Sequence, residues 1–170
     1  MAAPALAPPA SSEDAHKRGL ACLERRTYQE AIGCFQAAID LEKQEGAKTP
    51  RMKYVSYLGL ALALSQGRSE DAVRLCEQAI KREFFDPDLF CNLGIVYLRS
   101  RRKGPAFEAF QRGLALQPKH RRILEEMDRY NRRDDPVLSF LPRSHPLNRL
   151  AGRMRARLRA LFDRAAASEA

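Results

Sequence analysis

A spacing of glycine, alanine and aromatic residues constrains the fold of this chain more than any other feature. Its fullest copy lies between residues 87 and 120 and comprises Phe90-x₂-Leu93-Gly94-x₂-Tyr97, then Ala106-x₃-Phe110, then Pro118. Apolar residues three and four positions apart indicate helices, and the small residues Gly94 and Ala106 let two helices cross closely. A helical hairpin of this size cannot bury its apolar face alone, so neighbouring copies should stack on it.

Two weaker copies precede this one. Residues 52 to 86 carry Leu58-Gly59-x₂-Leu62 and Ala72-x₃-Cys76, and residues 12 to 45 keep Gly19, Ala31, Phe35 and Ala38. The threefold pattern resembles the tetratricopeptide repeat (TPR), a helix–turn–helix unit of about 34 residues. The resemblance covers residues 12 to 120 and implies an all-α fold, a right-handed solenoid of stacked hairpins.

Helix starts are predicted from local residue pairs. Thr27 with Glu30 fits a capping box at the second helix of the first repeat. Thr49-Pro50 and Asp86-Pro87 each place a side-chain acceptor before a proline that suits the first helical turn.

The resemblance also predicts a binding groove, because in this family the first helix of each unit lines a concave surface. With Gly19, Gly59 and Gly94 fixing the helix phase, a set of inward-facing residues follows. The set is His16, Lys17, Leu20, Leu23, Ser56, Tyr57, Leu60, Leu64, Asn92, Ile95 and Arg99.

One familiar function of the family is not expected. Members that bind heat-shock chaperones hold the C-terminal carboxylate of the chaperone with lysine, asparagine and arginine side chains. The matching positions here are His16, Leu20, Tyr57, Asp88 and Asn92. None keeps the clamp residue of its place, and Asp88 has the wrong charge for an anionic ligand.

Nothing in the sequence suggests an enzyme, a metal site or a cofactor. The four cysteines, Cys22, Cys34, Cys76 and Cys91, fall within predicted helices without C-x-x-C spacing, which favours buried structural thiols. The three histidines lie in different elements with no partner for catalysis. We therefore expect a non-catalytic protein.

Membrane and export signals are not apparent. The sequence has no apolar run of about 20 residues, and residues 1 to 11 read as a disordered lead-in rich in alanine and proline. This lead-in lacks the basic and apolar regions of a signal peptide, so a cytoplasmic location is expected.

The region after the repeats divides into three parts. Residues 121 to 132 place Ile123, Leu124, Met127 and Tyr130 on one face and predict a helix that caps the solenoid. Residues 133 to 145 form a proline-rich linker with an apolar run, Val137 to Leu141, that favours docking on another surface. Residues 146 to 164 predict a basic amphipathic helix, and residues 165 to 170 a disordered end.

Much of the net charge of +9 lies in this last helix, whose arginines include Arg149, Arg153, Arg155, Arg157 and Arg159. Three interpretations stay open. The apolar stripe packs back on the repeats, the arginines contact nucleic acid or anionic membrane, or the helix docks on a partner or a second copy of the chain.

The sequence as a whole predicts a TPR-like array with capping helix over residues 12 to 132. Its expected function is that of an adaptor or assembly module that binds a protein segment in the concave groove, with the C-terminal segment packing back on the repeats. The alternative is a scaffold or regulator whose arginine-rich helix contacts nucleic acid or anionic membrane.

Overall fold

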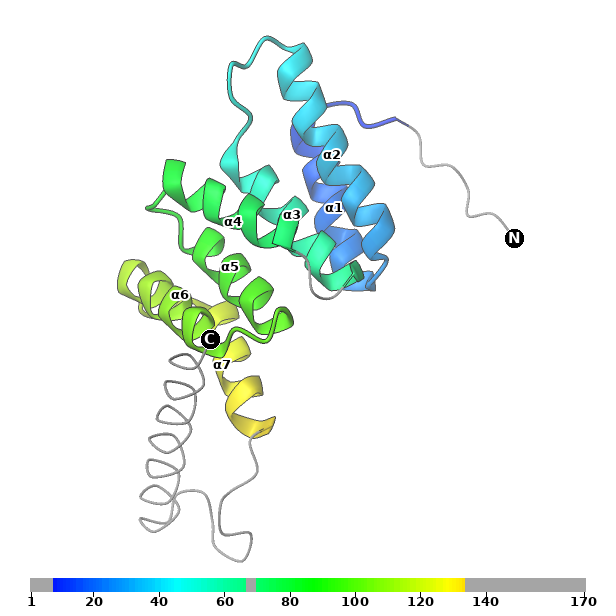
Figure 1. Cartoon of the computed structure of the whole chain (residues 1–170). Coiled ribbons are helices and arrows are strands. Elements are labelled where there is room, and N and C mark those ends of the chain that lie inside the picture. The colour runs from blue at the N-terminus through cyan, green and yellow to red at the C-terminus, as the bar shows by residue number, and fades with distance from the viewer. Residues whose placement is uncertain (1–7, 67–69, 134–170) are drawn as a thin grey trace, which may run out of the picture. The chain divides into compact units, whose positions relative to one another are not determined.

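The protein is helical throughout the part that the computed structural model describes, residues 8–66 and 70–133 (Figure 1). The described helices are α1 (Ser12–Arg25), α2 (Tyr28–Gln44), α3 (Met52–Gln66), α4 (Glu70–Arg82), α5 (Pro87–Arg99), α6 (Lys103–Leu116) and α7 (Arg121–Arg133). The chain divides into two compact units, Met1–Met127 and Asp128–Ala170, and the packing described below is that of the first.

Sequential helices pair into hairpins, α1 with α2, α3 with α4, and α5 with α6. Each hairpin packs on the next, because α2 and α5 both contact α3, and α4 contacts α5. The all-α array of stacked hairpins predicted from the spacing is confirmed.

The helices of each hairpin cross closely at a glycine. A Cβ atom added at Gly19 would meet the ring of Phe35, and one added at Gly94 would meet the ring of Phe110. At Gly59 the added atom would meet Cys76 Sγ at 2.8 Å and the backbone carbonyl oxygen of Ala72 at 2.9 Å. The glycines of the sequence pattern therefore provide space for an aromatic ring or a neighbouring helix backbone.

Two of the three predicted helix caps differ from expectation, although α2 does begin directly after Thr27. Asp86 does cap α5, since its side chain accepts a hydrogen bond from the Asp88 N–H and Pro87 follows it. The capping box at α2 was wrong, because Thr27 makes no side-chain cap. Its hydroxyl lies 3.4 Å from the Cys22 carbonyl oxygen at the end of α1 and donates to it.

The backbone N–H groups at the start of α3 donate to acids that are distant in sequence, and not to the Thr49 side chain. The Arg51 N–H donates to the Glu42 carboxylate at 2.7 Å, and the Met52 N–H donates to the Glu83 carboxylate at 3.3 Å. These two acids come from the end of α2 and the residue after α4. The first N–H groups of a helix have no acceptor within the helix and donate readily to carboxylates. Here they do so at Arg51 and Met52, and α3 begins at Met52.

Three of the four cysteines are buried, and Cys34 is half-buried. Burial raises the pKa of Cys76 and of Cys91 to about 12, so both thiols stay protonated at neutral pH. This agrees with the prediction of structural thiols for Cys22, Cys76 and Cys91, while Cys34 keeps some contact with solvent.

Candidate functional site

A polar cluster forms where α7 meets α3 and α5, the first helices of the second and third hairpins. The guanidinium of Arg122 donates from Nη1 to the Tyr57 hydroxyl at 2.8 Å and to Asp88 Oδ1 at 2.9 Å. Its Nη2 donates to Asn92 Oδ1 at 3.0 Å, and Asn92 Nδ2 donates to Ser56 Oγ at 3.2 Å. We call these five residues the Arg122 cluster.

The first turn of α7 fixes the position of Arg122. Ile123 is fully buried and anchors the helix. His120 Nδ1 accepts a hydrogen bond from the Ile123 N–H at 3.4 Å, which leaves the proton of a neutral imidazole on Nε2. That nitrogen lies 3.3 Å from Asp88 Oδ1, so Asp88 holds both residues at the start of α7.

Arg122 retains binding capacity within this cluster. A guanidinium has five N–H donors, and the described contacts occupy three of them. The side chains of Arg122 and Asp88 remain 38% and 28% exposed, so solvent or a ligand can reach them. Burial raises the pKa of Tyr57 to about 12, although Arg122 works against that shift, and the phenol is therefore neutral at physiological pH.

The predicted groove residues divide by burial into three groups. Five are buried: His16, Ser56, Tyr57, Leu60 and Asn92. Four are half-buried, namely Leu20, Leu23, Leu64 and Ile95, and two are exposed, namely Lys17 and Arg99. The fold brings Ser56, Tyr57 and Asn92 together around Arg122. A role of the eleven residues in binding stays a prediction.

His16 lies within an aromatic box. Its ring centroid is 4.9 Å from that of Tyr54, 5.1 Å from that of Tyr57 and 5.5 Å from that of Phe35. Neither ring nitrogen has a hydrogen-bond partner in the described part of the chain. Burial, helped by the nearby charge of Lys53, lowers the pKa of His16 to about 4. The residue is a neutral core side chain at neutral pH.

Sequence reasoning missed Arg122 and the partner role of Asp88. Asp88 reads as an isolated negative charge in the expected groove, because the arginine that pairs with it belongs to the next helix. Arg122 follows Arg121 at the start of a helix interpreted as a cap. A useful signal was the position of this arginine directly before Ile123, the first residue of the apolar face of that helix.

No group of three His, Cys, Asp or Glu side chains among the described residues is placed to hold a metal ion. Within the described ranges, no helix has the length and apolar character of a membrane span. The predicted basic tail, with Arg149, Arg153, Arg155, Arg157 and Arg159, lies outside the described residues.

The array was compared with known proteins. No family model and no curated protein sequence matches the chain. Among solved structures, the TPR domain of Arabidopsis OM64 aligns with a TM-score of 0.56 at 19% identity, over 74% of this chain and 98% of that one. The Sgt2 TPR domain from Aspergillus fumigatus aligns with a TM-score of 0.55 at 18% identity, over 87% of this chain and 99% of that one.

A third similar structure is the second TPR domain of human RPAP3 in complex with an HSP70 peptide. It aligns with a TM-score of 0.53 at 22% identity, over 73% of this chain and 95% of that one. The glycine crossings, the stacked hairpins and these alignments agree, and the chain has the tetratricopeptide-repeat fold.

Proposed function

We propose that the protein is a non-catalytic interaction module that binds a peptide or protein segment along α1, α3, α5 and α7. The Arg122 cluster carries this proposal. It holds a half-exposed guanidinium in one orientation, with two N–H donors left for a ligand. Similar structures support the binding of peptides, since two RPAP3 domains are described in complex with HSP90 and HSP70 peptides.

The neighbouring residues suggest the chemistry of the bound segment. Leu20 and Leu23 on α1 and Ile95 on α5 are half-buried apolar side chains that still present surface. Asp88 already forms an ion pair with Arg122. We therefore expect a segment with apolar side chains and one acceptor, a backbone carbonyl or a side-chain oxygen, that meets the guanidinium.

A chaperone tail is not the expected ligand. The clamp positions carry His16, a buried neutral ring, and Leu20, which has no charge. The carboxylate of Asp88 would repel a peptide that ends in several acidic residues and would lower its affinity. The peptides SRMEEVD and SGPTIEEVD should accordingly bind weakly, and Asp88→Asn should improve their binding.

Capture of partners by the full chain, followed by titration of the captured segment as a labelled peptide, tests the proposal. Arg122→Lys keeps the charge and loses the forked donor geometry, so the peptide should bind about tenfold more weakly. Arg121→Lys is the matched control, because Arg121 is the adjacent residue, 89% exposed and paired with Glu125. Equal affinity of both variants and of the original chain would reject the Arg122 cluster as the site.

A further inference from the structure

Two adjacent phenylalanines project from the connection between α4 and α5. Phe84 is 68% exposed and Phe85 is 67% exposed, more than any other large apolar side chain in the described residues. Their rings meet edge to face, with centroids 5.9 Å apart. Exposing apolar surface of this size to water is unfavourable in free energy, and such surface typically marks an interaction site. We name residues 81 to 85 the Phe84 tip.

The Phe84 tip is held in place by the bonds around it. The Glu83 N–H donates to the Ala79 carbonyl at 2.9 Å, continuing the end of α4. The Glu83 carboxylate accepts from the Met52 N–H, and Asp86 caps α5 directly after the pair. Both acids beside the phenyl rings are thus engaged with backbone N–H groups, and the rings are fixed on the outside of the array.

Basic residues precede the two rings in the chain and lie in the neighbouring connections. Lys81 and Arg82 lie in the last turn of α4, and Arg82 Nη1 donates to the Thr49 hydroxyl at 3.3 Å, which places the α2–α3 connection beside the tip. That connection adds Lys48, and the α6–α7 connection adds Lys119. Within the described part of the chain, Lys48, Lys81 and Lys119 take part in no salt bridge.

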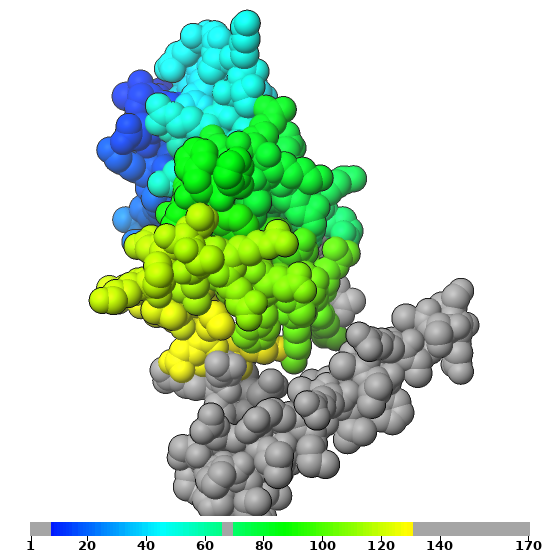
Figure 2. Space-filling model, turned by 90° about the vertical axis from the view of Figure 1, so that its left-hand side faces the viewer, coloured from blue at the N-terminus to red at the C-terminus, as the bar shows by residue number. Residues whose placement is uncertain are grey.

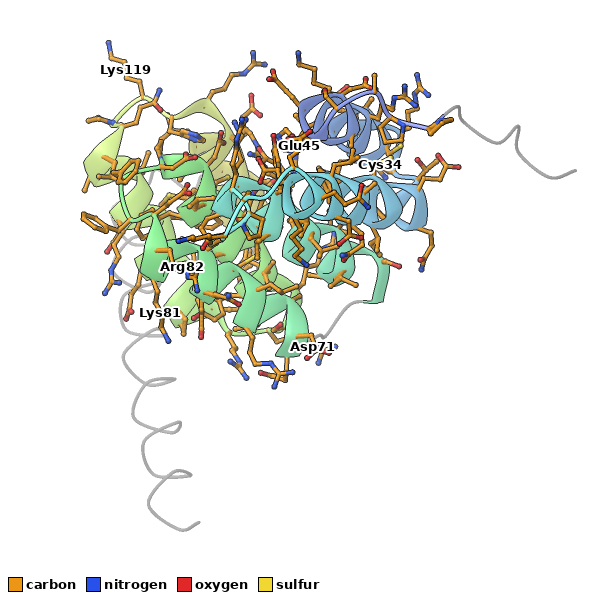
Figure 3. The ribbon with its side chains drawn as sticks, turned by 90° about the horizontal axis from the view of Figure 1, so that it is seen from above. Cys34, Glu45, Asp71, Lys81, Arg82 and Lys119 are labelled. Carbon is orange, nitrogen blue, oxygen red and sulfur yellow. The ribbon has the colours of Figure 1, made fainter. Side chains whose placement is uncertain are left out.

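These connections share one face of the molecule. Figure 2 shows them in sequence from top to bottom, the α2–α3 connection in cyan, the α4–α5 connection in green and the α6–α7 connection in yellow-green. Figure 3 shows Lys81 and Arg82 close together and Lys119 farther along the same side of the array, away from Cys34. Glu45 is an exposed acid at the α2–α3 connection, and it is outnumbered by the exposed cations Lys48, Lys81, Arg82 and Lys119.

We propose that the Phe84 tip inserts into the surface of an anionic lipid bilayer, separately from the peptide-binding face. A protruding pair of phenyl rings can be buried at the boundary between headgroups and acyl chains, because a fluid bilayer adapts to the shape of the inserted side chains. The lysines and the arginine around it complement anionic headgroups. Single-stranded nucleic acid fits less well, because edge-to-face rings offer no parallel platform for successive bases.

The absence of tryptophan from the whole sequence permits a direct test. Phe85→Trp in the full chain creates a single reporter at the tip. Its emission should shift to the blue with vesicles of phosphatidylcholine and phosphatidylglycerol, and not with phosphatidylcholine alone. Tyr28→Trp is the control, because Tyr28 begins α2 at the end of the helix opposite the α2–α3 connection, and its emission should stay unchanged.

A second pair of variants separates insertion from binding by the basic C-terminal region. Phe84→Ser with Phe85→Ser should lower the partition coefficient on the anionic vesicles at least about tenfold. A matched change of five tail arginines to glutamine should leave the blue shift of Phe85→Trp in place. The proposal fails if the Phe85→Trp emission responds to a single-stranded oligonucleotide and not to vesicles, or if the serine variant partitions like the original chain.

Discussion

The first and third hairpins cross at equivalent glycine–phenylalanine contacts, yet they bury a polar side chain in opposite ways. In α1, His16 lies among aromatic rings, and neither of its nitrogens has a described hydrogen-bond partner. In α5, Asn92 is fully buried with its oxygen bonded to Arg122 and its nitrogen bonded to Ser56. The first arrangement depends on the histidine staying neutral, whereas the second depends on its partners staying in place.

Filling the two glycine crossings should have the largest effect and should affect both hairpins alike. Gly19→Val and Gly94→Val each place side-chain atoms inside the space of a phenylalanine ring. Each should lower the free energy of unfolding by about 3 kcal/mol, measured by urea titration. Gly33→Val is the control, since nothing lies within 4 Å of its added Cβ. A large difference between Gly19 and Gly94 would break the equivalence of the hairpins.

Acidification should destabilise the first hairpin. The pKa of His16 is about 4 in the folded protein and 6.5 in a solvated chain, so the unfolded state binds the proton more tightly. Stability is therefore fully present above pH 6.5 and is lost as the pH falls toward 4, by about 3 kcal/mol. Lys53 and Arg51 near the ring oppose its protonation, while Glu13 and Asp88 favour it.

His16→Phe should remove that part of the pH dependence, because phenylalanine has no proton to bind. The measurement is the unfolding midpoint in urea at several pH values between 4 and 7, for the original chain and for the variant. His120→Phe serves as a comparison for a histidine that does have described contacts. If both chains lost stability equally on acidification, His16 would not be the responsible group.

Disrupting the partners of Asn92 should cost less, roughly 1–2 kcal/mol. Asn92→Leu leaves Ser56 without its donor and Arg122 without one acceptor, and both remain partly or fully shielded from water. Adding Arg122→Met should cost less than the same change in the original chain, because Asn92→Leu has already removed one of the acceptors of the guanidinium. Additive losses in thermal or urea unfolding would show that the two residues act independently.

The sequence predicted the crossing points better than the polar contacts. Gly94 and Phe110 were identified because the apolar residues recur at helical intervals, and Asp86-Pro87 because a cap acts within its own turn. Arg122 was not identified, since its acceptors are contributed by two other helices. The predicted cap of α3 was wrong for the same reason, because Glu42 and Glu83 lie close to the start of this helix only in the folded chain.

The smallest effect is expected at the turns inside the two hairpins. Arg26 and Arg101 have positive φ angles of 63° and 60°, a conformation that favours glycine. Arg26→Gly and Arg101→Gly should each raise stability by about 0.5–1 kcal/mol, visible as a higher thermal midpoint. Arg25→Gly, within α1, should lower it and provides the contrast. A gain in one hairpin alone would sharpen the difference between them.

The hydrogen bond from Arg122 to Tyr57 has a consequence for how the array unfolds. Arrays of repeats commonly lose structure one unit at a time from an end, because each unit contacts only its neighbours. Here α7 reaches past the third hairpin to α3 in the second. Fraying of α7 therefore removes contacts from two hairpins at once, so Arg122→Met should speed hydrogen exchange in α3 as well as in α5.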